Sequence, residues 1–286
     1  MRYIHLRFPG GLAKAVTFSY DDGVKQDIRL AKIFSDHGLK AGFNICAAPF
    51  VENRDNKLTA DEIREHILSK GHEVAVHGYN HIASGASHPV TTVRETVHSR
   101  EILEATFGGI IRGMAYPDSG IRRFSNGNSY DTVKDILTSV GIAYSRTTAT
   151  DASFNLPTDW HDWHSTAHHN NENLFDYIDE FLSFDYDKHF ASNKHPRLLK
   201  IWGHSYEFDR NNNWDRIEEI CRILGGRDDL WYATPIEIHD YVEAYNSLRF
   251  SADTYTAYNP TNTTVWLFTE GNLYSIAPGE TVILKK

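Results

Sequence analysis

The chain has 286 residues, of which 41% are hydrophobic, and its formal net charge is −9. A chain of this length and apolar content can bury the core of one large domain, which excludes intrinsic disorder. It contains no block of lysine or arginine, which argues against nucleic acid or an anionic membrane surface as a partner.

The N-terminal residues 1–11 mix polar and apolar positions, unlike the apolar centre of an export signal. No later stretch is apolar over the length that a bilayer requires. We therefore expect a soluble chain without membrane insertion, cytoplasmic as written. Cys46 and Cys221 lie in apolar stretches, so we expect buried free thiols rather than a disulfide.

Segments typical of strands and of helices alternate through most of the chain, which predicts an α/β fold with a parallel sheet covered by helices. Sequences such as TADE at 59–62 and TVRE at 92–95 indicate capping boxes at helix starts. In barrels built from βα units, the loops after the strands carry the catalytic residues. We predict strands at 13–18, 41–45, 73–76, 113–116, 142–146, 198–202 and 230–233.

Two of these strands lead into polar segments that look ordinary one at a time. The first is followed by Asp21 and Asp22 in SYDDG at 19–23, and Asp-Asp-Gly is a common turn sequence. The third is followed by HGYNH at 77–81, and an isolated HxxxH is most often two surface histidines. Each segment alone is a weak signal. Because both follow predicted strands and occur in this order, together they favour a metal site over two unrelated surface turns.

The chemistry of such a site follows from the residue types. His77 and His81 can converge on one cation if the backbone curls, and one carboxylate completes a set that leaves a position open for water. Only one of two adjacent aspartates can easily face the same ion, so the other is free to accept a proton from that water. The pattern thus predicts both a ligand and a general base.

The later part of the chain adds polar residues at the ends of further predicted strands. Tyr116, Arg146 and His204 end or directly follow such strands. The segment 147–173 lacks clear periodicity and is rich in Asp, His, Trp and Asn, so we expect an irregular loop that overhangs the site.

From residue 249 onward the pattern changes to short strands separated by turns, with strands expected at 264–268 and 281–284. This segment of about 38 residues is too short to fold securely alone. We therefore predict a barrel domain at 1–248 and a small β-rich appendage at 249–286 that packs on it.

Four segments in order, TFSYDDG at 17–23, HGYNH at 77–81, AYP at 115–117 and WGH at 202–204, resemble motifs of the polysaccharide deacetylases, also called NodB-homology or carbohydrate esterase family 4 enzymes. The resemblance implies a distorted (β/α)7 barrel with the β appendage added at its C-terminus. It also implies removal of acetyl groups from an N- or O-acetylated glycan or sugar with one divalent metal, usually Zn²⁺.

The resemblance also implies roles for particular residues. Asp22 would bind the metal together with His77 and His81, and Asp21 would be the general base. The backbone N–H of Tyr116 would share the developing oxyanion with the metal, and His204 would donate a proton to the leaving group. The side chain of Tyr116 could equally be a packing group.

This chain departs from the family at the third motif, where Ala115 stands in place of an arginine that supports the base. Arg146 ends the next strand, and we expect its guanidinium to pair with Asp21 instead. The alternative is a solvated surface arginine. Arg112 lies on the Ala115 strand at an odd offset and should point to the other face.

Four further residues are expected to contact the substrate. Trp163, His164 and His168 lie in the 147–173 segment, and aromatic rings such as Trp163 can stack on sugar faces or be buried. Trp202 replaces the family's usual leucine and would narrow the acetyl pocket.

The sequence leaves three hypotheses for the function. The leading hypothesis is hydrolytic deacetylation of an acetylated carbohydrate. A second is hydrolysis of a small C–N substrate such as a cyclic ureide, which some relatives of this family open. A third is a non-catalytic carbohydrate-binding protein with a vestigial site, which the presence of Asp21, Asp22, His77, His81 and His204 disfavours.

Overall fold

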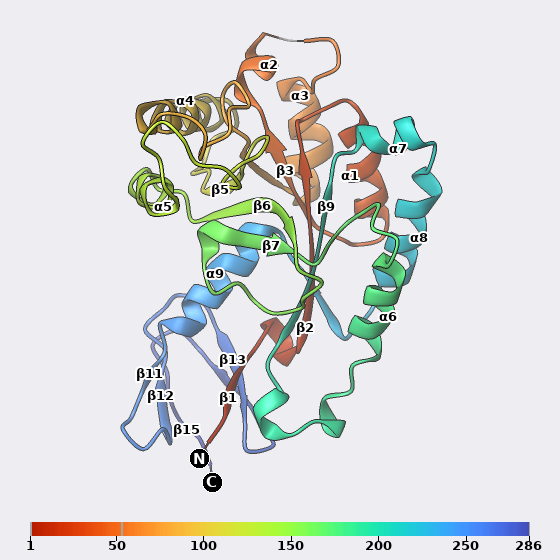
Figure 1. Ribbon diagram of the computed structural model, residues 1–286. Coiled ribbons are helices and arrows are strands. Elements are labelled where there is room, and N and C mark those ends of the chain that lie inside the picture. Colours follow the sequence, from red (N-terminus) through yellow and green to blue (C-terminus); the bar gives the residue numbers. More distant parts are fainter. Residues whose placement is uncertain (1, 53, 286) are drawn as a thin grey trace.

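The structure is a computed structural model that describes residues 2–52 and 54–285 (Figure 1). Its strands are β1 (Ile4–Arg7), β2 (Lys14–Asp21), β3 (Ala41–Ile45), β4 (Glu73–Val76), β5 (Gly113–Ala115), β6 (Tyr144–Thr150), β7 (Trp163–Ser165), β8 (Ala167–His168), β9 (Arg197–Gly203), β10 (Leu230–Tyr232), β11 (Arg249–Phe250), β12 (Thr256–Tyr258), β13 (Val265–Thr269), β14 (Asn272–Ile276) and β15 (Thr281–Ile283). Its α-helices are α1 (Gln26–Asp36), α2 (Ala47–Val51), α3 (Ala60–Glu62), α4 (Pro89–Phe107), α5 (Tyr130–Ser139), α6 (Leu174–Ser183), α7 (Tyr206–Asn211), α8 (Trp214–Leu224) and α9 (Pro235–Asn246).

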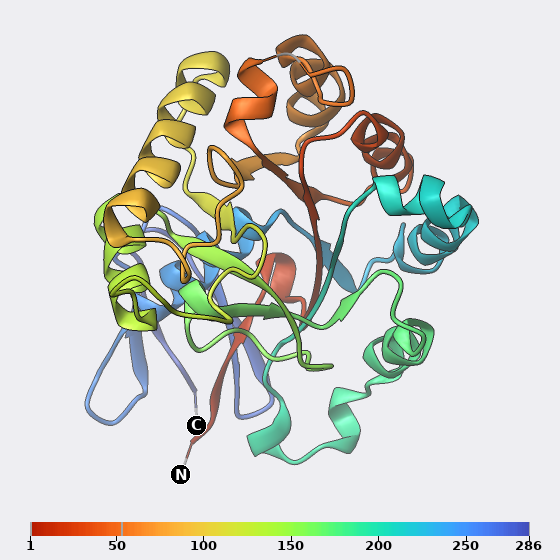
Figure 2. The same cartoon turned by 45° about the horizontal axis from the view of Figure 1, so that its top comes forward.

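Parallel strands form a closed barrel with helices around it (Figure 2). β2 to β6 lie in chain order, and β9 pairs with the other side of β2. The segment 163–168 closes the ring because β7 pairs with β6 while β8 pairs with β9. If β7 and β8 are taken as one position, the described part of the chain forms the expected distorted (β/α)7 barrel.

The closing strand differs from the one that the sequence predicted. The segment 230–233 was expected to be a barrel strand, but β10 pairs only with the first residues of β2. The closing segment 163–168 instead lies within the predicted irregular loop. It changes partner after a few residues, so it never builds a stretch of alternating polarity long enough to stand out.

The C-terminal appendage is joined by one strand from near the N-terminus, β1. β1 pairs antiparallel with β13, which pairs with β14, and β11, β12 and β15 form a second small sheet. Residues 1–248 were predicted to belong to the barrel, whereas Ile4–Arg7 belongs to a sheet of the appendage. A lone strand needs hydrogen-bond partners, and β13 offers β1 a free edge.

The appendage lies at the end of the barrel opposite the loops that follow β2, β3 and β4 (Figure 1). Tyr241 of α9 connects it to the barrel. Its hydroxyl donates a hydrogen bond to the carbonyl of Arg7 (2.7 Å) and accepts one from the N–H of Trp266 (2.9 Å).

Side chains of β2 alternate between the helices and the barrel interior, as the period of a strand requires. Phe18 and Tyr20 contact the ring of Phe34 on α1, with centroids 4.5 and 5.7 Å apart. Ser19 and Asp21 face inward and are buried. Among the described helices, none is both long enough and apolar enough to cross a membrane.

Replacing Tyr241 by phenylalanine should destabilise the fold, because it removes the hydrogen-bond partner of a buried carbonyl and of a partly buried N–H. The expected loss is about 1–3 kcal/mol of unfolding free energy, measured by urea unfolding. Tyr245→Phe is the matched control and should cost less, since its hydroxyl makes one longer bond, to Ile4 (3.3 Å). Equal stability of Tyr241→Phe and wild type would show that this connection contributes little.

Candidate active site

The carboxyl ends of β2 and β4 bring the three predicted metal ligands together. Asp22 follows β2 with φ 83°, and His81 has φ 61°, so the backbone curls at both places. Asp22 Oδ1 lies 3.8 Å from His77 Nε2 and 3.6 Å from His81 Nε2. Three such donors around one point can hold a divalent cation and leave room for water.

The protonation of His77 suits metal binding. Its Nδ1 lies 2.9 Å from the carbonyl oxygen of Ala115, which can only accept, so Nδ1 carries the proton. The lone pair of Nε2 therefore faces Asp22, as in metal-binding histidines whose other nitrogen donates to the protein. Burial lowers the pKa of His77, which favours the neutral form that a metal ligand needs.

Glu95 of α4 holds the turn that carries the two histidines. Its carboxylate accepts hydrogen bonds from the backbone N–H (2.6 Å) and the side-chain amide (2.8 Å) of Asn80. The sequence TVRE at 92–95 predicts a capping box that ends at Glu95, but α4 begins at Pro89 and is capped by His88. Glu95 therefore lies in the second turn of the helix, where its side chain reaches the histidine turn.

Asp21 and Arg146 form a buried ion pair. Nη2 of Arg146 donates to both carboxylate oxygens of Asp21, and Nε donates to Ser19 Oγ (3.2 Å). Asn44 Nδ2 adds a hydrogen bond to Asp21 Oδ1 (2.9 Å). Burial alone would raise the pKa of Asp21, but mainly the charge of Arg146 lowers it to about 2.

The contact expected between Arg146 and Asp21 is thus present, and Arg146 is fully buried rather than solvated. Its guanidinium also lies over the ring of Trp202, 4.5 Å from the centroid. Arg112, as expected, points elsewhere and pairs with Asp240. That Arg146 supports Asp21 as the general base remains a prediction.

His204 lies on the other side of Asp21, because β9 is the neighbour of β2. Its Nε2 is 3.9 Å from Asp21 Oδ2, and its Nδ1 is 3.2 Å from Glu207 Oε1. Burial opposes the charged ring, but the bond to Glu207 and the charge of Asp21 outweigh it and raise the pKa of His204. A raised pKa favours the protonated form of His204, which suits a proton donor beside the ionised Asp21.

Glu207 was not identified from the sequence, although a carboxylate three residues after a candidate acid, at the start of a helix, is a usable signal. Nε2 of His169 lies 3.0 Å and Nε2 of His168 lies 3.3 Å from its Oε2. The hydrogen bonds from His169 and His204 lower the pKa of Glu207 despite its burial. It therefore stays anionic beside His204.

The group His168, His204 and Glu207 brings ligand-type atoms close together, yet it does not suit a second metal. His168 Nδ1 accepts a hydrogen bond from the N–H of Asn170 (3.1 Å), so the proton of the neutral ring is on Nε2. That proton occupies the nitrogen that faces Glu207. The group is a hydrogen-bonded support for His204.

The structure corrects the predicted role of Tyr116. Its N–H donates to the carbonyl of Arg146 (2.9 Å) as part of the pairing between strands, and its hydroxyl donates to the carbonyl of His161 (2.9 Å). The predicted oxyanion donor is therefore already engaged. The ring is fully buried and acts in packing.

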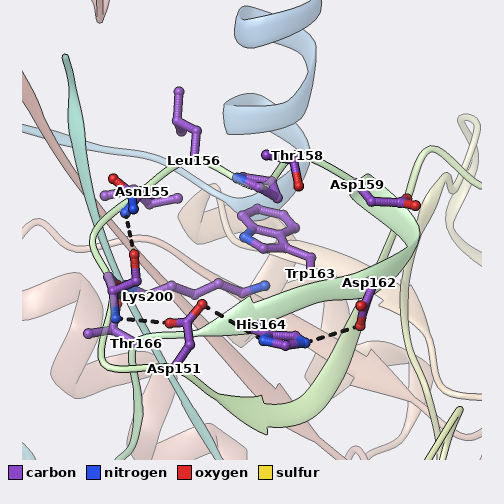
Figure 3. Close-up of a pocket in the computed structure, with 13 residues that line it drawn as sticks. Asp151, Asn155, Leu156, Thr158, Asp159, Asp162, Trp163, His164, Thr166 and Lys200 are labelled. Carbon is purple, nitrogen blue, oxygen red and sulfur yellow. Dashed lines mark hydrogen bonds and ion pairs between the residues drawn. The ribbon is translucent and has the colours of Figure 1, made fainter. Parts of the chain in front are cut away.

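The four predicted substrate contacts separate into two pairs. Trp163 is 2% exposed and lies over Lys200 inside the barrel, so it cannot stack on a sugar. His164 lies between Asp151 (3.8 Å) and Asp162 (3.1 Å), and both Trp163 and His164 line the pocket that Figure 3 shows. None of the three predicted metal ligands lines this pocket, so neither residue is placed at the metal cluster.

His168 and Trp202 do border the site. Their rings meet edge to face with centroids 4.8 Å apart, and Trp202 lies 5.7 Å from the ring of His204. They stay candidates for substrate contact.

Replacing Glu95 by glutamine should weaken metal binding, because it removes the charge that holds the histidine turn through Asn80. We expect about a tenfold loss of Zn²⁺ affinity, typical of groups that orient metal ligands. Competition with a chromophoric chelator measures the affinity. Glu101→Gln on the same helix is the control, since Glu101 is exposed and contacts only His98 among the described ion pairs. Equal Zn²⁺ affinity of the Glu95→Gln and Glu101→Gln variants would show that Glu95 does not support metal binding.

The comparisons with known proteins come from sequence and from structure. Residues 10–144 match the sequence model of the polysaccharide deacetylase family. No sequence among curated proteins matches this chain.

Solved structures share the barrel. One described as a probable polysaccharide deacetylase from Pseudomonas aeruginosa PAO1 has 15% identity and a TM-score of 0.56, over 82% of this chain and 92% of that one. Puue allantoinase has 14% identity and a TM-score of 0.55, over 82% and 91%. A Streptococcus pyogenes deacetylase, PplD, with acetate bound, matches at 20% identity with a TM-score of 0.41; the match spans 46% of this chain and 55% of that one.

At such identities the two structures with TM-scores above 0.5 show the fold alone, and the sequence match adds a similarity to the family over residues 10–144. The matched segment contains both aspartates and both histidines of the cluster. Over residues 10–144, the chain is similar in sequence to the polysaccharide deacetylase family.

Proposed function

We propose that this protein is a metal-dependent hydrolase that removes acetyl groups from an N- or O-acetylated carbohydrate. The sequence match to the family supports a hydrolase that acts on amide or ester bonds. The observation that carries the proposal is the position of Asp21. Its Oδ2 lies 3.9 Å from Nε2 of His77 and 3.9 Å from Nε2 of His204, between the ligand cluster and the candidate acid.

Asp22, His77 and His81 would hold the metal, and we propose Zn²⁺ because histidine and carboxylate ligands suit it. When bound, a divalent ion polarises the acetyl carbonyl and lowers the pKa of water beside it. The donor set fits this group, since the two nitrogens lie within 3.8 Å of the carboxylate oxygen and the His77 lone pair faces it.

The protein's own residues would move the protons. Asp21 accepts a proton from the attacking water, while Arg146 and Asn44 hold its carboxylate in one orientation. His204 then gives the proton on Nε2 to the departing oxygen or nitrogen of the sugar. Glu207 keeps the ring oriented and protonated through Nδ1.

The substrate distinguishes the two enzymatic candidates. The shared fold of Puue allantoinase keeps a small C–N substrate, such as a cyclic ureide, as the second candidate. His168 and Trp202 border the site and are proposed to contact the acetylated sugar.

Acetate release from a panel of N- and O-acetylated sugars and glycans tests the proposal, with a cyclic ureide in the same panel. We expect acetate release that disappears on chelation and returns with Zn²⁺. Asp21→Asn should bind the metal but lose at least about 100-fold in turnover, because an amide cannot accept the proton. Ureide opening without acetate release would favour the second candidate. Stoichiometric metal with no turnover of any substrate would favour the vestigial site.

Replacing Glu207 by glutamine should shift the pH dependence of deacetylation. His204 acts in its protonated form, so activity falls as pH rises through its pKa. Glu207 helps to raise this pKa, and its loss lowers it, so the decline at high pH should begin at a lower pH.

The shift is measured from kcat against pH for wild type and variant. Glu219→Gln is the control, because Glu219 is paired with Arg222 on the exposed face of α8. If the decline of kcat at high pH is unchanged in the Glu207 variant, His204 is not the general acid whose pKa Glu207 raises.

A further inference from the structure

Cys46 lies beside the proposed metal ligands. It directly follows β3, the strand between β2 and β4, which deliver Asp22 and His77. Its side chain is buried, with 3% of the residue exposed. Its sulfur and the ligand atoms of Asp22, His77 and His81 all lie within 4.8 Å of one another.

We propose that Cys46 is a fourth protein ligand of the metal, so that the set is one aspartate, one cysteine and two histidines. This proposal rests on the metal site of the proposed function. The sequence predicts a buried free thiol at Cys46, and Cys46 lies outside the four motifs that carry the family resemblance.

The distances suit the assignment. Metal bonds of about 2.0–2.1 Å to nitrogen or oxygen and about 2.3 Å to sulfur place tetrahedral ligands roughly 3.3–3.7 Å apart. Asp22 Oδ1 is 3.6 Å from His81 Nε2, 3.8 Å from His77 Nε2 and 4.0 Å from Cys46 Sγ. The other pairs of ligand atoms lie within 4.8 Å of one another, so side-chain movements of about 1 Å would bring the four atoms to this spacing.

The thiol has two hydrogen-bond acceptors within reach, the carbonyl oxygen of His77 (3.3 Å) and Asp22 Oδ1 (4.0 Å), and only the first would not itself be part of the ligand set. Binding of the metal breaks the S–H bond and forms the sulfur–metal bond, and the proton passes to the solvent. Wild type should therefore release about one proton more per bound ion than a variant without the thiol. A cysteine that merely packs would release none.

A sulfur ligand would also determine which class of metal the site prefers. A thiolate is a soft ligand that favours zinc, cobalt and cadmium over magnesium and manganese. Zinc sites can expand to five ligands, so four protein ligands still leave a position for water. The proposal therefore gives a physical reason for zinc in this chain.

Titration of the metal-free protein with Co²⁺ tests the proposal without any activity measurement. Wild type should show an intense near-ultraviolet band from charge transfer between thiolate and cobalt. Cys46→Ser and Cys46→Ala should lack it, while Cys221→Ser should keep it, because Cys221 is a buried thiol on α8 within the hydrophobic core. Circular dichroism confirms that the variants are folded.

Two further readouts use the same proteins. The extra proton, measured by calorimetry in buffers of different ionisation enthalpy, should vanish in Cys46→Ser. The preference for Zn²⁺ over Mn²⁺ should fall about tenfold or more in that variant.

Stoichiometric cobalt binding by wild type with no charge-transfer band, and with proton release equal to that of Cys46→Ser, would overturn the role of Cys46 and leave the histidine–aspartate site intact. Failure of folded wild type to bind Co²⁺ or Zn²⁺ would overturn this proposal together with the metal site of the proposed function.

Discussion

The buried pair of Arg146 and Asp21 is the interaction on which the site depends. Both side chains are shielded from water, and an ionised group alone in such a place would cost several kcal/mol. Ser19 and Asn44 satisfy further hydrogen-bonding positions, and the Trp202 ring covers the guanidinium. Removal of either partner would leave the other as an uncompensated buried charge.

The rest of the barrel interior limits its charge around this pair. Burial raises the pKa of Glu73 to about 7, and Tyr144 donates a hydrogen bond to it. Burial also holds the pKa of Lys200 well below its usual range, and the nearby Arg146 adds to this effect. Its Nζ lies over the ring of Trp163. Both pKa shifts favour the neutral form of the side chain, so they reduce the charge around the ion pair of Arg146 and Asp21.

The order of strands explains how distant residues meet. β2 has β3 on one side and β9 on the other, so Asp21 ends between the strand that leads to Cys46 and the strand that leads to His204. Glu95 comes from α4, which follows β4, and Glu207 comes from α7, which follows β9. Strand order therefore brings the candidate ligands, base and acid together, and the two helices supply carboxylates that hold the histidine turn and His204.

Local patterns in the sequence were sufficient for the α/β class, for most of the barrel strands and for the convergence of Asp22, His77 and His81. The reason is that strand ends and turn residues act over a few positions, and parallel strands bring their carboxyl ends to one edge. The pairing of Arg146 with Asp21 was one of two readings, because alternation tells which face a side chain takes but not whether water or a partner meets it.

Only the tertiary structure decided the remaining features. Which N–H is free depends on the register of the neighbouring strand, and this removed Tyr116 from the predicted oxyanion site. Closure by 163–168 and the pairing of β1 with β13 are contacts between segments far apart in the chain. The positions of Glu95 and Glu207 likewise follow from helix packing. Such contacts are set by the neighbours that a residue acquires on folding, and no local period in the sequence encodes them.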